Sequence, residues 1–260
     1  MIERYRKYLP GILAIFIISG CGGASNQKVT PVLPPTRKID AATAGSITGK
    51  VTLDGQPPPF KPIDMSAEPY CERLNTAPVF PQQVVTGDAG GLANVVVYVK
   101  DFPADYIVAA PGGPAILSQH GCMYDPHVVA LRTGQPLEIR NDDQATHNIL
   151  AMPEQNPKWN RSETPRAAPI EEIFATPELA IPLRCNVHPW MKSYVFVFSH
   201  PYYAVTAKDG QFELKNLPPG AYTVEAWQEK YGKQDAIITV GPRESKSADF
   251  KFNAAGGPGN

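Results

Sequence analysis

Apolar and polar residues alternate in short runs along most of this chain, which is the period expected of half-buried β-strands. The runs are rich in Val, Ile, Tyr and Phe, and Gly, Pro and Asp turn signals separate them. The clearest examples are residues 47–51, 92–102, 127–132, 136–141 and 211–214. The pattern predicts an all-β chain.

The N-terminal segment has a different pattern. Arg4, Arg6 and Lys7 precede the apolar run GILAIFIISGC, which is too short to span a bilayer as a stable helix. A basic start followed by a short apolar run is typical of a secretory signal. We therefore expect residues 1–20 to be a signal peptide and the mature chain to lie outside the cytoplasm.

The apolar run ends in Ile18-Ser19-Gly20-Cys21, which resembles the bacterial lipobox. The resemblance implies that Cys21 becomes the lipidated first residue of a lipoprotein on the periplasmic side of a bacterial membrane. Gly22, in place of the Asp that retains relatives at the inner membrane, favours the outer membrane. The alternative is a plain signal peptide, or a short anchor, with an incidental cysteine.

Length and charge limit the organisation and the class of partner. A chain of 260 residues can hold two modest domains. The net charge of -1 gives no argument for nucleic acid or an anionic membrane surface as a partner. Residues 21–45 show no apolar periodicity and are expected to be a flexible tether, and residues 253–260 are expected to be a disordered tail.

Three further cysteines need an explanation in an oxidising compartment, where a free thiol is a liability. They are Cys71, Cys122 and Cys185. With Cys21 lipidated, three remain, and three cannot all pair. One cysteine is therefore left for other chemistry.

The stretch RCNVHPWMK brings Cys185, His188 and Met191 together in the sequence. A thiolate, an imidazole and a thioether suit copper better than magnesium or calcium, and a blue-copper plane needs a second histidine. His147, which follows a predicted strand and a polar loop, is the candidate. Zinc also accepts Cys and His but has little use for a thioether. The alternative without a metal is a buried thiol, a surface histidine and a core methionine.

Residues 113–200 resemble a cupredoxin domain of the plastocyanin and amicyanin kind. The resemblance is carried by PHVVALRTGQPLEIRNDDQATHN and by CNVHPWM, which has the short amicyanin-type spacing. It implies a Greek-key sandwich with one type 1 copper. The implied ligands are His147, Cys185, His188 and Met191. It also implies that Asn148 steadies the cysteine loop by hydrogen bonding.

Trp190 and three further histidines complete the set of candidate residues. Trp190 either shields the copper and offers an apolar docking surface beside His188, or packs in the core. His127, at the start of a predicted strand, is a weaker candidate for a metal role. His120 and His200 are expected to be ordinary exposed residues near turns.

If Cys185 is a copper ligand, Cys71 and Cys122 remain to form a disulfide. By loop-closure entropy such a bridge would contribute about 4 kcal/mol to stability. It would also staple the start of the cupredoxin segment to the domain that precedes it. Two free thiols are the alternative.

The C-terminal part resembles the carboxypeptidase regulatory-like, prealbumin-like β-sandwich. The segment DGQFELKNLPPGAYTV matches the family pattern, and residues 49–51 and 93–99 match its earlier strands. The C-terminal piece alone is too short for a stable sandwich. We therefore expect residues 46–112 and 201–252 to fold together, with the cupredoxin segment inserted between them. The alternative is a sandwich of residues 46–112 followed by an independent C-terminal domain.

These features predict an exported, membrane-anchored type 1 copper protein that carries single electrons and is not an enzyme. The sequence has no nucleophile elbow, phosphate loop or HExxH motif, and its five histidines are too few for the second centre of a copper oxidase or nitrite reductase. The expected partners are an unidentified redox protein and the membrane that holds the lipid, with no nucleic acid. The alternatives are a copper-delivery lipoprotein, in which the metal is cargo, and an adhesion or scaffold module with a structural copper.

Overall fold

The computed structural model describes residues 36–256. The predicted signal peptide, Cys21, most of the predicted tether and the end of the predicted tail lie outside the described residues. In the part of the chain that the structure describes, no helix is long and apolar enough to cross a membrane. Almost all of the regular elements are β-strands arranged in sandwiches, so the all-β fold class is confirmed.

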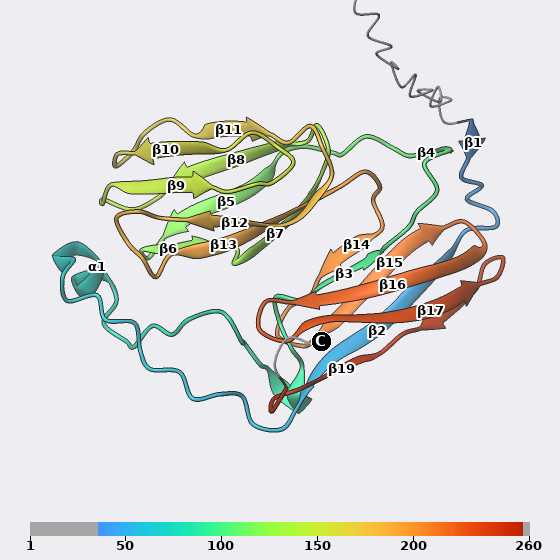
Figure 1. The fold of residues 1–260 in the computed structure, drawn as a ribbon, viewed down its shortest axis with the longest axis horizontal. Coiled ribbons are helices and arrows are strands. Elements are labelled where there is room, and N and C mark those ends of the chain that lie inside the picture. Colours follow the sequence, from blue (N-terminus) through green and yellow to red (C-terminus); the bar gives the residue numbers. More distant parts are fainter. Residues whose placement is uncertain (1–35, 257–260) are drawn as a thin grey trace, which may run out of the picture. The chain divides into compact units, whose positions relative to one another are not determined.

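The first sandwich extends from residue 115 to residue 198 and contains two sheets (Figure 1). One sheet has five strands in the order β10-β9-β12-β13-β7, and the other has four in the order β11-β8-β5-β6. The chain changes sheet between β7 and β8 and again between β8 and β9, as in a Greek-key sandwich. The strands are β5 (Ala115–His120), β6 (Met123–Asp125), β7 (Val128–Arg132), β8 (Pro136–Asn141), β9 (His147–Ala151), β10 (Trp159–Glu163), β11 (Ile170–Ile173), β12 (Glu178–Arg184) and β13 (Lys192–Phe198).

The core of the first sandwich lies between its two sheets. Leu117 and Ile139 of one sheet belong to the same buried cluster as Leu183 of the other. Cys185 and Met191 extend this cluster beyond the ends of β12 and β13. A site built on these two residues is therefore anchored directly to the apolar core.

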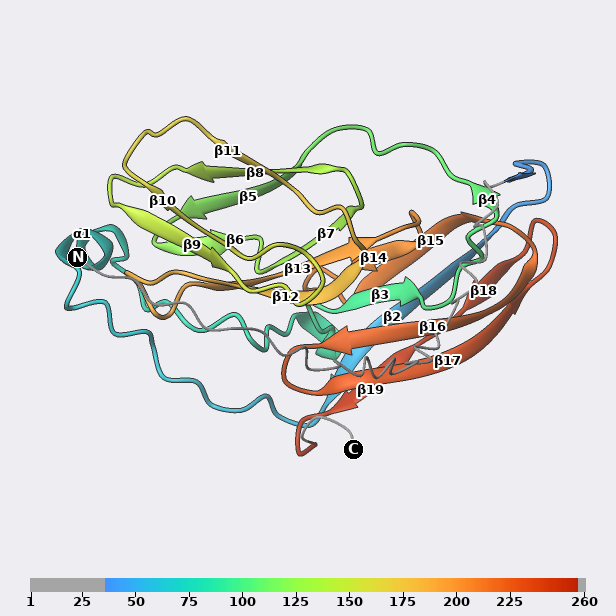
Figure 2. The same cartoon turned by 45° about the horizontal axis from the view of Figure 1, so that its top comes forward.

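The second sandwich combines strands from both sides of the first sandwich in the sequence (Figure 2). In one sheet β2 pairs with β15, β18 and β19, and in the other β3 lies between β14 and β16, with β17 at the edge. Its strands are β2 (Gly45–Asp54), β3 (Val96–Val99), β14 (Tyr203–Val205), β15 (Gln211–Leu217), β16 (Gly220–Gln228), β17 (Gly232–Val240), β18 (Ser245–Ser247) and β19 (Phe250–Asn253).

Part of the predicted tether is ordered. A short strand, β1 (Arg37–Lys38), pairs in parallel with β4 (Tyr106–Ile107). The guanidinium carbon of Arg37 lies 4.1 Å from the centroid of the Tyr106 ring, a cation–π contact. Apolar periodicity gives no sign of this pairing, because backbone hydrogen bonds and one charged side chain make it.

An apolar cluster joins the two sandwiches, which belong to one compact unit. Tyr98 of β3 packs with Phe196 and Phe198 of β13, on the face of β13 that points away from the first core. Beside this cluster, His127 Nε2 lies 2.6 Å from the Glu229 carboxylate in the turn after β16. Because both faces of β13 are covered, its sequence is a nearly continuous apolar run.

The long connection from β2 to β3 leaves the second sandwich and reaches the first. It contains the short helix α1 (Pro69–Leu74) and the 3-10 turn η1 (Asp88–Gly90), and Figure 1 shows α1 beside the first sandwich. The backbone N–H of Ile63 donates to the Val79 carbonyl at 2.8 Å, which closes the loop that carries α1. We call residues 63–79 the cap.

Candidate metal centre

Two connections at one end of the first sandwich supply the predicted ligands. His147 is the first residue of β9, and Cys185, His188 and Met191 lie in the loop from β12 to β13. The last residue of β12, Arg184, faces the first residue of β13, Lys192, in an antiparallel ladder. This pairing forces the loop between them to be tight.

The cysteine loop closes on itself with backbone hydrogen bonds. The N–H of Cys185 donates to the Met191 carbonyl at 3.3 Å, and the N–H of Met191 donates to the His188 carbonyl at 2.9 Å. The N–H of His188 also donates to the Cys185 sulfur at 3.3 Å. The positions of these three side chains are therefore set by local hydrogen bonds between two paired strands.

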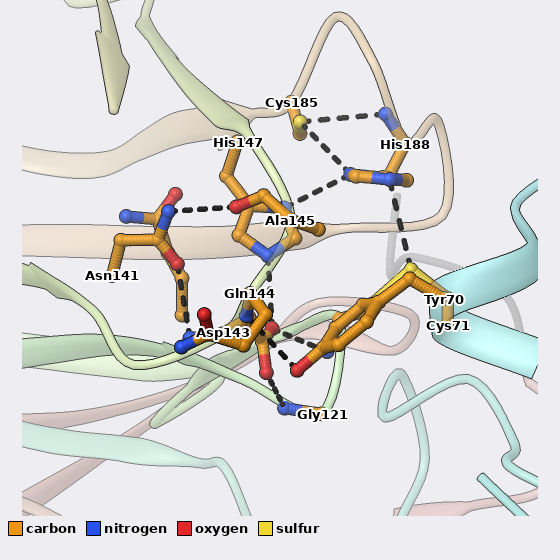
Figure 3. A network of polar contacts seen from close by, with 12 residues as sticks. Tyr70, Cys71, Gly121, Asn141, Asp143, Gln144, Ala145, His147, Cys185 and His188 are labelled. Carbon is orange, nitrogen blue, oxygen red and sulfur yellow. Dashed lines mark hydrogen bonds and ion pairs between the residues drawn. A yellow bond between two sulfur atoms is a disulfide. The ribbon is translucent and has the colours of Figure 1, made fainter. Parts of the chain in front are cut away.

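The nitrogen and sulfur donors converge on one point (Figure 3). The Nδ1 atoms of His147 and His188 are 2.9 Å apart, and the Cys185 sulfur lies 3.7 Å from the His188 Nδ1. One donor atom from each of the three residues lies within 4.8 Å of the others. Met191 is buried in the same cluster as Cys185.

The donor residues are shielded from solvent. His147 is 0% exposed, His188 1%, Cys185 4% and Met191 0%. Two imidazoles, one thiolate and a nearby thioether fit a soft or borderline metal such as copper, and they do not fit magnesium or calcium. The residues present therefore match the copper that the sequence resemblance implied.

The electrostatics of the metal-free centre favour a thiolate beside an imidazolium. Burial alone would raise the pKa of Cys185, but hydrogen bonds from His147 and His188 lower it to about 6. Burial alone would lower the pKa of His147, but the Asp143 carboxylate and the Cys185 thiolate raise it to about 9. A metal cation held by His147 would compete with this proton, so its binding would release a proton.

Asn148 contacts the cysteine loop from the neighbouring strand. Its Oδ1 accepts the backbone N–H of Asn186 at 3.2 Å. Its Nδ2 donates to the Arg161 carbonyl at 2.9 Å and to Asn160 Oδ1 at 2.6 Å. These contacts tie the loop that carries Cys185 to β9 and β10.

Asp143 is a buried residue of the site that sequence reasoning missed. Its carboxylate accepts a hydrogen bond from His147 Nε2 at 2.8 Å and is 1% exposed. Burial raises the pKa of Asp143, but hydrogen bonds from His147 and the backbone of Cys122 and Gly121 lower it below its ordinary value. The available signal was its position in the polar loop just before His147, where an acid would normally be expected to face solvent.

The cap covers the outer edge of His188. The predicted disulfide between Cys71 and Cys122 is present, and the Cys71 sulfur lies 3.7 Å from His188 Nε2. A Glu68 carboxylate oxygen lies 3.8 Å from the same nitrogen. The sequence predicted a bridge between two domains, but it gave no sign that the bridge would lie against a candidate ligand.

Other contacts fasten the cap to the first sandwich. Asn75 Nδ2 donates to the Gly121 carbonyl at 3.1 Å, and the Gln144 N–H donates to the Tyr70 hydroxyl at 2.9 Å. The apolar part of this junction is small and consists of Met65, Met123 and the two cysteines, with partly buried side chains around them. The disulfide is therefore at the centre of the contact.

Trp190 packs against the site and is half-buried. Its ring lies 5.2 Å from the His188 ring between centroids, and its indole N–H donates to the Cys122 carbonyl at 2.9 Å. These contacts place Trp190 as a shield beside His188. They also place it against the cap cluster, so it packs and shields at the same time.

The other histidines lie away from the donor cluster. His120 is exposed, as predicted. His127 links the two sandwiches through Glu229, which is a structural contact. The prediction that His200 is exposed is wrong, because it is 6% exposed and lies among the rings of Phe102, Phe198 and Tyr202. Its position just after β13 gave no sign that the second sandwich would cover it.

Comparisons with known proteins concern only about a third of the chain. No protein-family model matches this chain, and no curated protein matches it. Among solved structures it is similar to a copper-containing nitrite reductase from Thermus scotoductus SA-01, at 19% identity and a TM-score of 0.30, covering 35% of this chain and 25% of that one.

Two further similar solved structures are an amicyanin and a cupredoxin. A Cu(I) form of an amicyanin mutant matches at 14% identity and a TM-score of 0.29, covering 35% of this chain and 86% of that one. A purple cupredoxin from Nitrosopumilus maritimus matches at 20% identity and a TM-score of 0.28, covering 33% and 99%. This chain spans about a quarter of the nitrite reductase it matches. The assignment of a metal therefore depends on the donors themselves.

Proposed function

We propose that this protein binds one type 1 copper ion and acts as a one-electron carrier. The ligands would be His147, Cys185, His188 and Met191. The observation that carries the proposal is the convergence of two histidine Nδ1 atoms and one cysteine sulfur within 4.8 Å, with Met191 buried in the same cluster as Cys185. Such a donor set is typical of blue-copper electron-transfer sites, where the bound copper supplies a one-electron redox couple.

The chain fixes its donors before any metal binds. The antiparallel ladder of β12 and β13 sets the ends of the cysteine loop, and Asn148 ties that loop to the strand that carries His147. Buried side chains in a packed core have few alternative positions. A preorganised donor set supports electron transfer, because little needs to move when the charge of the centre changes.

Burial of the centre favours a carrier over a copper-delivery protein. An electron can pass through packed atoms, whereas a copper ion can leave only if the protein opens a path. Here the cap, fastened by the Cys71–Cys122 disulfide, lies against His188. A protein that hands its metal to a partner would instead be expected to keep its ligands accessible.

The same burial supports the proposal that the protein is not an enzyme. A substrate that reacts at a metal needs an open coordination position. The four candidate ligands are each at most 4% exposed, so a substrate would have no open path to a metal held by them.

We further propose that the protein is exported and anchored by a lipid on Cys21, with the outer membrane favoured. The lipobox-like sequence and the basic, then apolar, N-terminus support this. The disulfide supports it independently, because such bridges persist mainly in oxidising compartments. The partner in electron transfer would be another redox protein.

Redox cycling distinguishes an electron carrier from a protein that delivers copper as cargo. The full chain with Cys21→Ser, which prevents lipid attachment, is loaded with copper and passed through repeated cycles of reductant and oxidant. A carrier returns the same absorption spectrum after each cycle and retains its copper. Copper that binds but cannot be cycled, or that passes readily to a competing chelator, contradicts the carrier function and favours the delivery alternative.

A further inference from the structure

A buried carboxylate sits behind one of the candidate ligands. Asp143 lies in the polar loop between β8 and β9, and its side chain points away from solvent toward His147 (Figure 3). Asp143 is not one of the four candidate ligands. A buried charge is costly unless it is paired and hydrogen-bonded, so its position requires an explanation.

Three N–H groups converge on this carboxylate. Oδ2 accepts from His147 Nε2 at 2.8 Å and from the backbone N–H of Cys122 at 2.8 Å, and Oδ1 accepts from the backbone N–H of Gly121 at 2.9 Å. Gly121 and Cys122 form a turn in which both residues have positive φ, at 65° and 56°. This turn points two successive amides at the same side chain.

The loop that carries Asp143 is itself braced. The Asp143 N–H donates to Asn141 Oδ1 at 3.1 Å, and Asn141 Nδ2 donates to the Ala145 carbonyl at 2.9 Å. The carboxylate therefore has little freedom to turn away from His147. Its orientation is set by the braced loop that carries it and by the backbone amides of Gly121 and Cys122.

The hydrogen bond selects which nitrogen of His147 faces the donor cluster. A carboxylate only accepts hydrogen bonds, so Nε2 must carry the hydrogen. Nδ1 then points toward His188 Nδ1 and the cysteine loop, where its lone pair is available once its proton leaves. The two histidines are not equivalent, because His188 Nε2 faces the Cys71 sulfur at 3.7 Å and a Glu68 carboxylate oxygen at 3.8 Å, which is too far for a hydrogen bond.

We propose that Asp143 is a positioning residue of this centre: it holds His147 with Nδ1 toward the other donors, and its negative charge favours the oxidised state of a metal bound there. The second part rests on the proposed function, whereas the first concerns the protein without metal. A carboxylate behind a metal-binding imidazole makes that ligand more basic. A more basic ligand stabilises the higher charge and lowers the reduction potential.

The positioning role is tested in the metal-free full chain by long-range 15N–1H NMR of the histidine rings. In the unmodified chain, we expect His147 Nε2 to carry a downfield hydrogen that exchanges slowly with solvent, because it is buried and hydrogen-bonded to Asp143. In Asp143→Ala this resonance moves upfield, and exchange accelerates by at least about tenfold because the acceptor is lost. Asp142→Ala, at the exposed neighbouring acid, leaves it unchanged.

The charge effect is tested with Asp143→Asn and the matched control Asp142→Asn, both loaded with copper. The amide keeps one oxygen for His147 and the shape of the side chain, and it removes the charge. If Asp143→Ala fails to fold, the Nε2 hydrogen of Asp143→Asn should still move upfield, by a smaller amount, because a neutral oxygen is a weaker acceptor than a carboxylate. Without this charge, the oxidised copper ion should bind less tightly relative to the reduced ion. We expect the ratio of their binding constants to fall about tenfold in Asp143→Asn, which raises the one-electron potential by about 59 mV. Asp142→Asn should shift it far less.

Two outcomes would overturn the proposal. An unchanged Nε2 resonance in Asp143→Ala contradicts positioning, whether or not the protein binds copper. A potential that Asp143→Asn and Asp142→Asn shift equally contradicts a specific effect of the buried charge. If copper does not bind at all, the proposed function fails, and the NMR result still decides the positioning role.

Discussion

His188 Nε2 lies 3.7 Å from the sulfur of Cys71, and Cys71 is disulfide-bonded to Cys122. This contact joins a candidate metal ligand of the first sandwich to a loop that begins in the second. The second sandwich is therefore more than a spacer, because its β2–β3 connection supplies the cap of the centre.

Removing the disulfide should lower the stability of the protein and accelerate the release of copper. We expect Cys71→Ser with Cys122→Ser to lower the free energy of unfolding by about 4 kcal/mol, from the lost loop constraint. Copper release to a Cu(I) chelator should accelerate by at least about tenfold, since the cap then opens more often. The rate of chelator complex formation measures this.

The matched control for the cap is Leu214→Ala, in the core of the second sandwich and outside the cap. It should cost about 2 to 5 kcal/mol of stability without accelerating copper release to the same extent. If the double serine variant releases copper at the original rate, the cap does not guard the centre.

Met191 should act as a ligand and not only as core filler. Met191→Leu conserves volume, so we expect it to cost less than about 1.5 kcal/mol in the metal-free protein. Its copper form should nevertheless differ in EPR spectrum and reduction potential, because a weak axial ligand tunes both. Met152→Leu serves as the control. An identical spectrum and potential in Met191→Leu would show that the thioether only fills space.

Asn148 should support the copper site from outside the donor set. Asn148→Ala removes the acceptor for the Asn186 N–H, so we expect copper affinity to fall by about 10- to 100-fold, measured by competition with a chelator. Asn160→Ala removes another partner of Asn148 and leaves the contact to the cysteine loop intact. Equal losses in the two variants would argue against a specific role of that contact.

Stability should fall in mild acid because His200 is buried as the neutral form. Burial, reinforced by the positive charge of Arg132, lowers the pKa of His200 to about 4. In the unfolded chain His200 takes up a proton near pH 6.5, whereas in the folded chain it does so only near pH 4. Neutral His200 therefore stabilises the fold fully above pH 6.5, and this stabilisation is lost as pH falls toward 4. The loss amounts to roughly 3 kcal/mol.

Denaturant unfolding at pH 7 and pH 4.5 measures this effect. His200→Asn keeps an acceptor for the Tyr202 N–H, which in the native chain donates to His200 Nδ1 at 3.2 Å, and it removes the titrating group. The variant should lose markedly less stability between the two pH values. The same loss in both proteins would assign the acid sensitivity to other groups.

The sequence could select the candidate donors because three of them lie close together in the chain and the fourth lies on a neighbouring strand. Cys185, His188 and Met191 lie in one short loop between paired strands, and His147 begins a strand beside it, so pattern and donor chemistry were sufficient to select them. The all-β class followed from alternation in the same way. These features depend on neighbours in the chain or in one sheet.

The missed features depend on contacts between distant segments. Asp143 looked like an ordinary acid of a polar loop, because nothing in the sequence says that the amides of Gly121 and Cys122 will surround it. His200 looked like a turn residue, since its burial requires both sandwiches. The position of the cap against His188 likewise requires the whole fold.

The most direct test of the copper centre is the visible and EPR spectrum of the copper-loaded protein, measured beside Cys185→Ser. If Cys185 is a copper ligand, we expect an intense blue thiolate-to-copper band that reductant bleaches and oxidant restores, and that is absent from the serine variant. A protein that binds no copper, or whose copper spectrum is the same in Cys185→Ser, would contradict this assignment.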